Sequence, residues 1–405
     1  MTRARPLANI RILDFFWLIA GPLASRTLAN FGAEVIKVES AHRLDQIRET
    51  GVFPAGEEAN IDKNGVFNDC NTGKLSITLN VNRPKGRELC LELVKISDVV
   101  TNNFRPDRMD RWGLGYRDLV KVKPDIIMLS MPVMGTTGPL RNYGANGSVI
   151  PGAAGLNLLT GFPNRPPIGV GPLYSDFTSP YLAVTLILAA LRHRDRTGRG
   201  QFIDVPQVPA TVSLLGPAIL EYTANGIVAG RAGNRRSDAC PHGAFRCQGE
   251  DRWCVVAVET EEQWQRLCTA IGRPEMAADP RFATIEARKR HEDEVEAAVE
   301  AWTAQQVDLD AMHLLQAAGV PAGIVETVQD MLESDYGLRE RHFTLVSQPD
   351  GTAFVTHKDP IKFVGRQETV DRAPIMGEHN EYVFKALLGL SEDEIVELMA
   401  EGVIY

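Results

Sequence analysis

Short apolar segments alternate with helical patterns through the first 200 residues. The predicted strands cover residues 10–15, 33–39, 75–81, 98–103, 126–131 and 201–205. Helical patterns such as 21–32 and 83–95 lie between them. Short apolar strands that are separated by helices are typical of a parallel sheet with helices on both faces. The sequence therefore predicts an α/β fold, in which ligands bind beyond the carboxyl ends of the strands.

The stretch 174–205 combines an unusually apolar helical pattern with an acidic residue just ahead of it. Apolar side chains run almost without a break through 181–191. A helix that starts at Pro180, capped by the Thr-Ser pair before it, is predicted to be buried on most sides. Asp176 would then precede the positive end of the helix, where an ionised carboxylate is favoured. Asp176 is a candidate nucleophile, although an aspartate in such a place is more often simply a cap.

Length and charge restrict the class of protein. A chain of 405 residues is too long for one ordinary core, which favours two domains. The formal net charge of -9 argues against a nucleic-acid partner, because phosphate binding needs a basic face. No apolar run approaches the roughly 18 residues that a membrane helix needs. Without a secretory pattern at the N-terminus, the predicted location is the cytoplasm.

The usual cofactor and metal motifs are missing from the sequence. No G-x-G-x-x-G follows the first predicted strand, so a glycine-rich dinucleotide site is not expected. The six cysteines form no C-x-x-C pair and are expected to be buried free thiols. Cys240, His242, Cys247 and Cys254 do not have the spacing of a zinc site, since two of them fall in predicted hairpin strands. We predict no metal.

The pattern changes near residue 206. Residues 206–225 are predicted to be a linker, and 226–328 combine a hairpin with charged helices, which indicates a smaller α+β domain. Residues 329–349 are predicted to be a second linker. The pattern alone leaves open whether 350–405 is a third piece or returns to the first domain.

Several motifs occur in a fixed order along nearly the whole chain. They are Asn-Phe-Arg-Pro at 103–106 with Asp-Arg at 110–111, Gly-Thr-Thr-Gly-Pro at 135–139, Asp176 followed by Thr-Gly-Arg-Gly-Gln at 197–201, Ala-Gly-Val-Pro-Ala-Gly at 318–323, and Gly-Glu-His at 377–379. Together they resemble the class III CoA-transferase family, which includes formyl-CoA and carnitine CoA-transferases. The resemblance implies a Rossmann-like large domain built from both chain ends, 1–205 and 350–405, plus the small domain. It also implies an interlocked, ring-like homodimer.

The same resemblance assigns roles to individual residues. Asp176 matches the nucleophile of the family. The positions that match coenzyme contacts are Leu18, Ile19, Lys74, Asn103, Phe104 and Arg111. Lys74 and Arg111 would neutralise phosphate groups, although such charges are by default solvated surface groups. Phe104 and the loop that contains Trp17 would offer apolar surface to adenine and the pantetheine arm. Trp17, Asn146 and His242 are candidates for binding the substrate.

The implied chemistry is covalent catalysis by a carboxylate. Asp176 would attack an acyl-CoA donor, with succinyl-CoA as one candidate, and pass through an aspartyl-acyl anhydride to an aspartyl-CoA thioester. An acceptor acid would then leave as its own CoA thioester. The resemblance implies no tightly bound cofactor, because coenzyme A and acyl-CoA are substrates.

Two other functions remain open. The racemase branch of the family has a histidine at the position of Asn146, and asparagine cannot carry a proton at neutral pH, which weakens the reading of an acyl-CoA racemase or epimerase. A non-catalytic scaffold subunit in a heteromeric transferase is the second alternative, and the presence of Asp176 argues against it.

Overall fold

The computed structural model, which describes residues 5–55, 60–171, 173–364 and 370–405, contains a six-stranded parallel sheet. Its strands are β1 (Arg11–Phe15), β2 (Glu34–Glu39), β3 (Leu75–Thr78), β4 (Val99–Asn102), β5 (Ile127–Ser130) and β6 (Phe202–Asp204). The order is β3-β2-β1-β4-β5-β6, and every neighbouring pair is parallel. The predicted α/β class is confirmed, and all six predicted strands are present. The strand order reverses between β1 and β4, which is where sheets of this type bind ligands.

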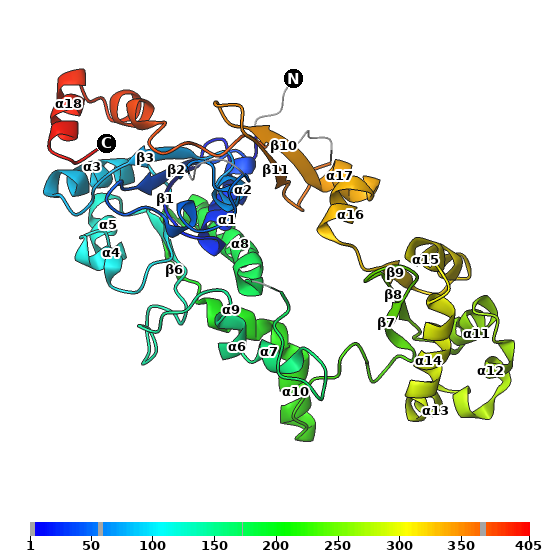
Figure 1. Ribbon diagram of the computed structural model, residues 1–405. Coiled ribbons are helices and arrows are strands. Elements are labelled where there is room, and N and C mark those ends of the chain that lie inside the picture. The colour runs from blue at the N-terminus through cyan, green and yellow to red at the C-terminus, as the bar shows by residue number, and fades with distance from the viewer. Residues whose placement is uncertain (1–4, 56–59, 172, 365–369) are drawn as a thin grey trace. The chain divides into compact units, whose positions relative to one another are not determined.

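Helices cover both faces of this sheet, and each face has its own apolar core (Figure 1). Alanine and leucine side chains of α1 (Ala20–Asn30) pack with α8 (Tyr174–Thr197) on one face. On the other face the core is formed by α3 (Pro84–Lys95), α5 (Tyr116–Val122) and α18 (Glu392–Ala400). The remaining elements of this part are α2 (Gly65–Cys70), α4 (Arg108–Arg111), α6 (Ile150–Ala153), α9 (Gln207–Val212), α10 (Gly216–Asn225) and α17 (Tyr336–His342). The short helix α7 (Leu156–Leu159) follows α6 along the chain.

The last part of the chain packs against the β3 edge of the sheet. The β10 (Phe343–Ser347) and β11 (Ala353–His357) strands form an antiparallel hairpin, and a π-helix (Glu381–Leu387) precedes α18. Nδ1 of His379 accepts a hydrogen bond from the Ser76 N–H at 3.2 Å, and Oδ1 of Asn380 accepts one from the Thr78 N–H at 2.9 Å. These bonds use N–H groups of the edge strand that would otherwise lack a partner.

Contacts divide the chain into two units. The first contains Met1–Leu156, Gly169–Ile227 and Gly337–Tyr405, and the second contains Asn157–Ile168 and Val228–Tyr336. Asn157–Ile168, which the sequence analysis placed in the large domain, groups with the second unit, where the Gly233 N–H donates to the Gly161 carbonyl at 2.9 Å. The second unit has a three-stranded antiparallel sheet of β7 (His242–Arg246), β8 (Trp253–Ala257) and β9 (Ala322–Ile324). Its helices are α11 (Glu261–Ala270), α12 (Pro274–Ala278), α13 (Ile285–Arg290), α14 (Glu292–Thr303), α15 (Asp308–Ala317) and α16 (Val328–Glu333).

Helix α8 differs from its prediction in two ways. It begins at Tyr174, so Pro180 lies inside it and Asp176 occupies the first turn instead of preceding the helix. One side of the helix is buried, but Phe177, Tyr181 and Leu188 on the other side are exposed in the single chain. A proline removes only the hydrogen bond from its own nitrogen, so a helical turn can form ahead of it when the surrounding structure supports that turn.

Two further properties concern the described residues as a whole. None of their helices is long and apolar enough to cross a membrane. They contain no group of three or more His, Cys, Asp or Glu side chains that could hold a metal ion. All six cysteines are buried free thiols, as the sequence analysis predicted.

Candidate active site

A cleft of about 580 Å³ opens where the strand order reverses, at the carboxyl ends of β1, β2 and β4. Trp17 and Leu18 follow β1, Arg43 follows β2, and Asn103 and Phe104 follow β4, and all five line the cleft. The structure therefore brings together four residues that the sequence analysis assigned to coenzyme or substrate binding, namely Trp17, Leu18, Asn103 and Phe104. The three strands end at one edge of the sheet because they are parallel, and this places their loops side by side.

Aromatic rings form one wall of the cleft. The ring centroids of Trp17 and Phe104 are 5.3 Å apart and those of Phe104 and Trp112 are 5.5 Å apart, both in edge-to-face geometry. The guanidinium of Arg43 lies 5.7 Å from the Trp17 ring, and that of Arg108 lies 5.6 Å from the Trp112 ring. The wall thus offers flat apolar surface with a cation at each end, which suits a planar base attached to phosphates.

The charge of the cleft is positive. The basic side chains that line it are His42, Arg43, Arg105 and Arg108. Glu39 also lines it, but both of its oxygens accept hydrogen bonds from Arg48 at 2.8 Å. The sequence analysis did not assign these four residues. Arg105 belongs to the Asn-Phe-Arg-Pro motif at 103–106, and the signal for the other three was their place just after β2 and β4.

Asn103 holds the loop that follows β1. Its Oδ1 accepts from the Trp17 N–H at 3.0 Å, and its Nδ2 donates to the Trp17 carbonyl at 2.8 Å. Leu18 has a left-handed backbone with φ of 66° and is 38% exposed at the rim. Ile19 is buried at the start of α1, where it packs with Leu23 and Phe67, so its side chain belongs to the core.

The two predicted phosphate ligands lie outside the lining of the cleft. The ammonium of Lys74 is fully buried, pairs with Asp14 at 3.2 Å and donates to Asn71 Oδ1 at 2.9 Å. Burial lowers its pKa to about 8, and Asp14 counteracts this shift only in part. Lys74 is therefore not the solvated surface charge that the sequence suggested by default. Arg111 is exposed at the end of α4 and is not among the residues that line the cleft.

Asp176 is a desolvated carboxylate without a side-chain partner. It is 9% exposed, and burial raises its pKa to about 6. Within the described part of the chain, no hydrogen bond or ion pair is made by its carboxylate oxygens, although its N–H donates to the Leu173 carbonyl at 2.8 Å. A Cβ on Gly147 would lie 2.3 Å from Oδ2, so only glycine permits this close approach. A carboxylate that is poorly solvated and unpaired is a stronger nucleophile than one in water.

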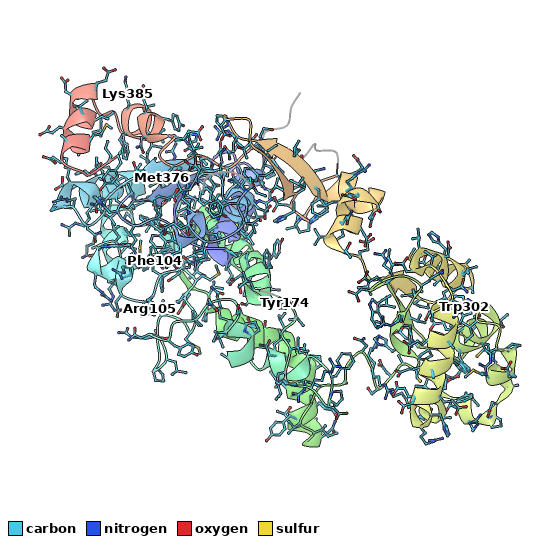
Figure 2. The ribbon with its side chains drawn as sticks, in the orientation of Figure 1. Phe104, Arg105, Tyr174, Trp302, Met376 and Lys385 are labelled. Atoms are coloured by element: carbon cyan, nitrogen blue, oxygen red, sulfur yellow. The ribbon has the colours of Figure 1, made fainter. Side chains whose placement is uncertain are left out.

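A short segment connects Asp176 to the wall of the cleft. Gly144 lies against Arg105, because a Cβ on Gly144 would be 2.5 Å from the guanidinium Nη2. Gly147, three residues later, lies against Asp176. Three peptide steps span at most about 11 Å, so the Cα atoms of Gly144 and Gly147 lie within that distance of each other. Figure 2 labels Phe104 and Arg105 after β4, and Tyr174 in the first turn of α8.

The other two candidates for binding the substrate lie in different places. Asn146 is exposed, and its Oδ1 accepts from the Ser148 N–H at 3.2 Å. His242 lies in the second unit at the start of β7, and its Nδ1 is hydrogen-bonded to the Asn234 carbonyl. It lines a separate concave surface of about 380 Å³ with small residues of β7, β8 and β9.

Comparison with known proteins identifies the family of this chain. The model of CoA-transferase family III matches residues 7–380. A succinyl-CoA–D-citramalate CoA-transferase of Chloroflexus aurantiacus is 33% identical over 401 residues, which cover 99% of this chain and 98% of the relative. A formyl-CoA:oxalate CoA-transferase of Streptomyces coelicolor is 32% identical over 419 residues, with 99% and 100% covered. The crystal structure of a CAIB/BAIF family protein from Brucella suis has a TM-score of 0.85 and 32% identity, with 95% of this chain and 100% of that chain covered. The chain belongs to CoA-transferase family III and is a CoA-transferase.

Proposed function

We propose that this enzyme moves CoA from an acyl-CoA donor to a free carboxylic acid through covalent intermediates on Asp176. The observation that carries the proposal is the buried, unpaired carboxylate of Asp176, which the segment 144–147 connects to Arg105 of a basic, aromatic cleft. A carboxylate needs no base to activate it, because at neutral pH it is ionised and already nucleophilic.

The reaction proceeds by exchange between groups of similar reactivity. An oxygen of Asp176 attacks the thioester carbonyl, and the C–S bond breaks to give an aspartyl-acyl anhydride and CoA thiolate. The thiolate attacks the aspartyl carbonyl and releases the donor acid as a carboxylate, which leaves an aspartyl-CoA thioester. The acceptor carboxylate attacks this thioester, and the released thiolate then takes the acceptor acyl group from the new anhydride. Asp176 is regenerated, and no nucleotide hydrolysis is required.

The cleft is the proposed site of the coenzyme. Its aromatic wall of Trp17, Phe104 and Trp112 would contact the adenine and the apolar arm. Arg43 and Arg108, at the two ends of that wall, would neutralise phosphate groups. Lys74 is not included, since its ammonium is bound to Asp14 inside the core.

Succinyl-CoA is the proposed donor, by analogy with the relative that is named for it. The identity of the acceptor is left to a screen of acids. Asn146 has no titratable proton, so a racemase that needs a second acid or base opposite Asp176 is not favoured.

A transfer assay tests the proposal. The purified chain is incubated with succinyl-CoA, formyl-CoA or acetyl-CoA and a panel of mono- and dicarboxylic acids, and new CoA thioesters are measured by chromatography. We expect transfer from at least one donor, and we expect Asp176→Asn to reduce kcat at least about 1,000-fold while the protein stays folded. Full turnover by the variant would overturn the mechanism. An unaltered chain that binds CoA but transfers nothing would indicate a scaffold subunit, and deuterium incorporation at the α-carbon would indicate a racemase.

A further inference from the structure

The backbone of the loop after β1 is fixed by a buried ion pair beneath the cleft. Nζ of Lys37 donates to the Phe16 carbonyl at 2.7 Å and pairs with Oδ2 of Asp45 at 3.0 Å. Oδ1 of Asp45 accepts from the Leu18 N–H at 2.9 Å. Both charged side chains are 0% exposed and neither lines the cleft. The pair therefore holds the backbone of this loop from the core side, while Trp17 and Leu18 of the same loop line the proposed coenzyme site.

Asp45 also joins two walls of the cleft. Besides the Leu18 N–H, its Oδ1 accepts from the Ile47 N–H at 3.2 Å and so caps the turn Gln46–Arg48 after β2. Gln46 in that turn lines the cleft, as does Leu18 in the loop after β1. One carboxylate thus sets the position of both loops relative to each other.

Stability alone does not account for this arrangement. Removing two charges from water costs more than their attraction usually returns, and an apolar pair of similar volume is often at least as stable. Leu18 adopts a left-handed backbone with φ of 66°, which is unfavourable for a leucine. The charge-assisted bond from its N–H to Asp45 holds it there.

The acidic groups around Lys37 favour its charged form. Burial by itself would lower the pKa of Lys37, but Asp45, Glu39 and Asp14 outweigh burial and raise it. Glu39 is itself bound to Arg48, and Asp14 to Lys74. Lys37 therefore remains a cation that can hold both the Phe16 carbonyl and the Asp45 carboxylate.

We propose that Lys37 and Asp45 are positioning residues, which preset the Trp17–Leu18 loop for the acyl-CoA and thereby set the affinity of the cleft for the coenzyme. This inference rests on the proposed function of the cleft. Without the pair, the loop would adopt several conformations and would have to be ordered each time the coenzyme binds. The apparent affinity would then be reduced to the fraction of molecules whose loop is already in the binding conformation.

The test removes both charges and keeps the volumes nearly unchanged. The double variant Lys37→Met/Asp45→Asn leaves neither charge of the pair alone in the core, so it avoids the large penalty of a single buried charge. We expect the Kd of CoA, measured by calorimetry, to rise about tenfold or more, and the KM for acyl-CoA to rise with it. We expect kcat to change less than about threefold, because the chemistry takes place at Asp176. If the pair only stabilised the fold, the double variant would melt at a lower temperature but would not show a raised KM together with a nearly unchanged kcat.

A second ion pair provides the matched control. Arg194 and Asp98 pair at 2.9 Å with side chains 12% and 22% exposed, and Asp98 precedes β4 at the opposite end of the strand from the cleft. The double variant Arg194→Met/Asp98→Asn should leave the Kd of CoA unchanged. Equal Kd values for the unaltered and Lys37→Met/Asp45→Asn proteins would overturn the inference, and so would equal weakening in both double variants.

Hydrogen exchange of the unaltered protein tests the same point without a variant. In the absence of CoA, the Leu18 amide should be protected about as strongly as the amides of β1, because its acceptor is buried and charged. Rapid exchange at Leu18 would show that the loop is not preset and would overturn the inference. Absence of any CoA binding by the unaltered chain is a separate result, which would contradict the proposed function itself.

Discussion

The pKa of Asp176 predicts how the activity depends on pH. Burial raises this pKa from 3.8 to about 6, and the attacking species is the ionised form. For the free enzyme, kcat/KM should therefore be flat above about pH 7 and fall about tenfold per pH unit well below pH 6. A profile that stays flat down to about pH 4 would mean that the group is not desolvated as described.

The raised pKa of Asp176 also makes the stability of the protein depend on pH. The direction of this dependence is opposite to that for a salt-bridged aspartate, whose pKa is lowered. Because the folded-state pKa of Asp176 is raised, the favourable contribution of its protonated form is present in full below about pH 4 and is lost as the pH rises through about 6. Asp176→Asn should therefore melt higher than the unaltered protein at pH 7 and close to it near pH 4. Melting curves of the two proteins at both pH values check this.

Gly147 gives a third prediction at the scale of one residue. A methyl group on Gly147 would lie 2.3 Å from Oδ2 of Asp176, so Gly147→Ala must displace the carboxylate. We expect kcat to fall about 100-fold, while the Kd of CoA changes less than about twofold. The control is Gly216→Ala, where an added Cβ meets no atom within 4 Å. An active Gly147→Ala enzyme would show that the carboxylate has room to move.

At the scale of an element, helix α8 positions the nucleophile through an internal proline. Pro180 has no N–H to donate to the carbonyl of Asp176 four residues earlier, and its ring crowds that carbonyl. Pro180→Ala should let residue 180 donate to the Asp176 carbonyl, shift the first turn and lower kcat about tenfold. The change in stability should be less than about 1 kcal/mol, because the new hydrogen bond offsets the lost packing. Arg192→Ala, an exposed change on the same helix, should have no effect. Unchanged kcat in Pro180→Ala would show that the proline does not help to position Asp176.

The elements themselves were largely predictable from the sequence, whereas the contacts between them were not. Apolar segments such as 126–131 identified β5. The start of α8 was misplaced because Pro180 was interpreted as a first helical residue. The burial of Lys74 depends on Asp14, which lies 60 residues away in the chain, and no local pattern reveals such a pairing.

At the scale of the whole molecule, the apolar residues exposed on α8 and α10 predict assembly. Phe177 and Leu182 on α8 are 46% and 41% exposed, and Leu220 and Tyr222 on α10 are 67% and 59% exposed. Exposed apolar surface of this kind marks an interaction site, and the proposed partner is a second copy of this chain. Native mass spectrometry should give twice the chain mass of 44.5 kDa, and the dimer should persist on dilution. A monomer, or a chain that is active only with a different subunit, would contradict this.

The division of the chain into two units also could not be predicted from local sequence patterns. Composition marked a change near residue 206, but residues 157–168 join the second unit through contacts with residues near 231–233, about 70 positions later. Arg231, for example, donates to the Phe162 carbonyl at 3.3 Å. Such pairings arise only when the chain has folded back on itself.

The most direct test of the central claim is to capture the covalent intermediate. The unaltered enzyme is incubated with acyl-CoA alone, treated with hydroxylamine, digested and analysed by mass spectrometry. The account predicts a hydroxamate on the peptide that contains Asp176 and no modification of the Asp176→Asn protein. A modified residue elsewhere, or an unmodified peptide from an enzyme that turns over, would contradict it.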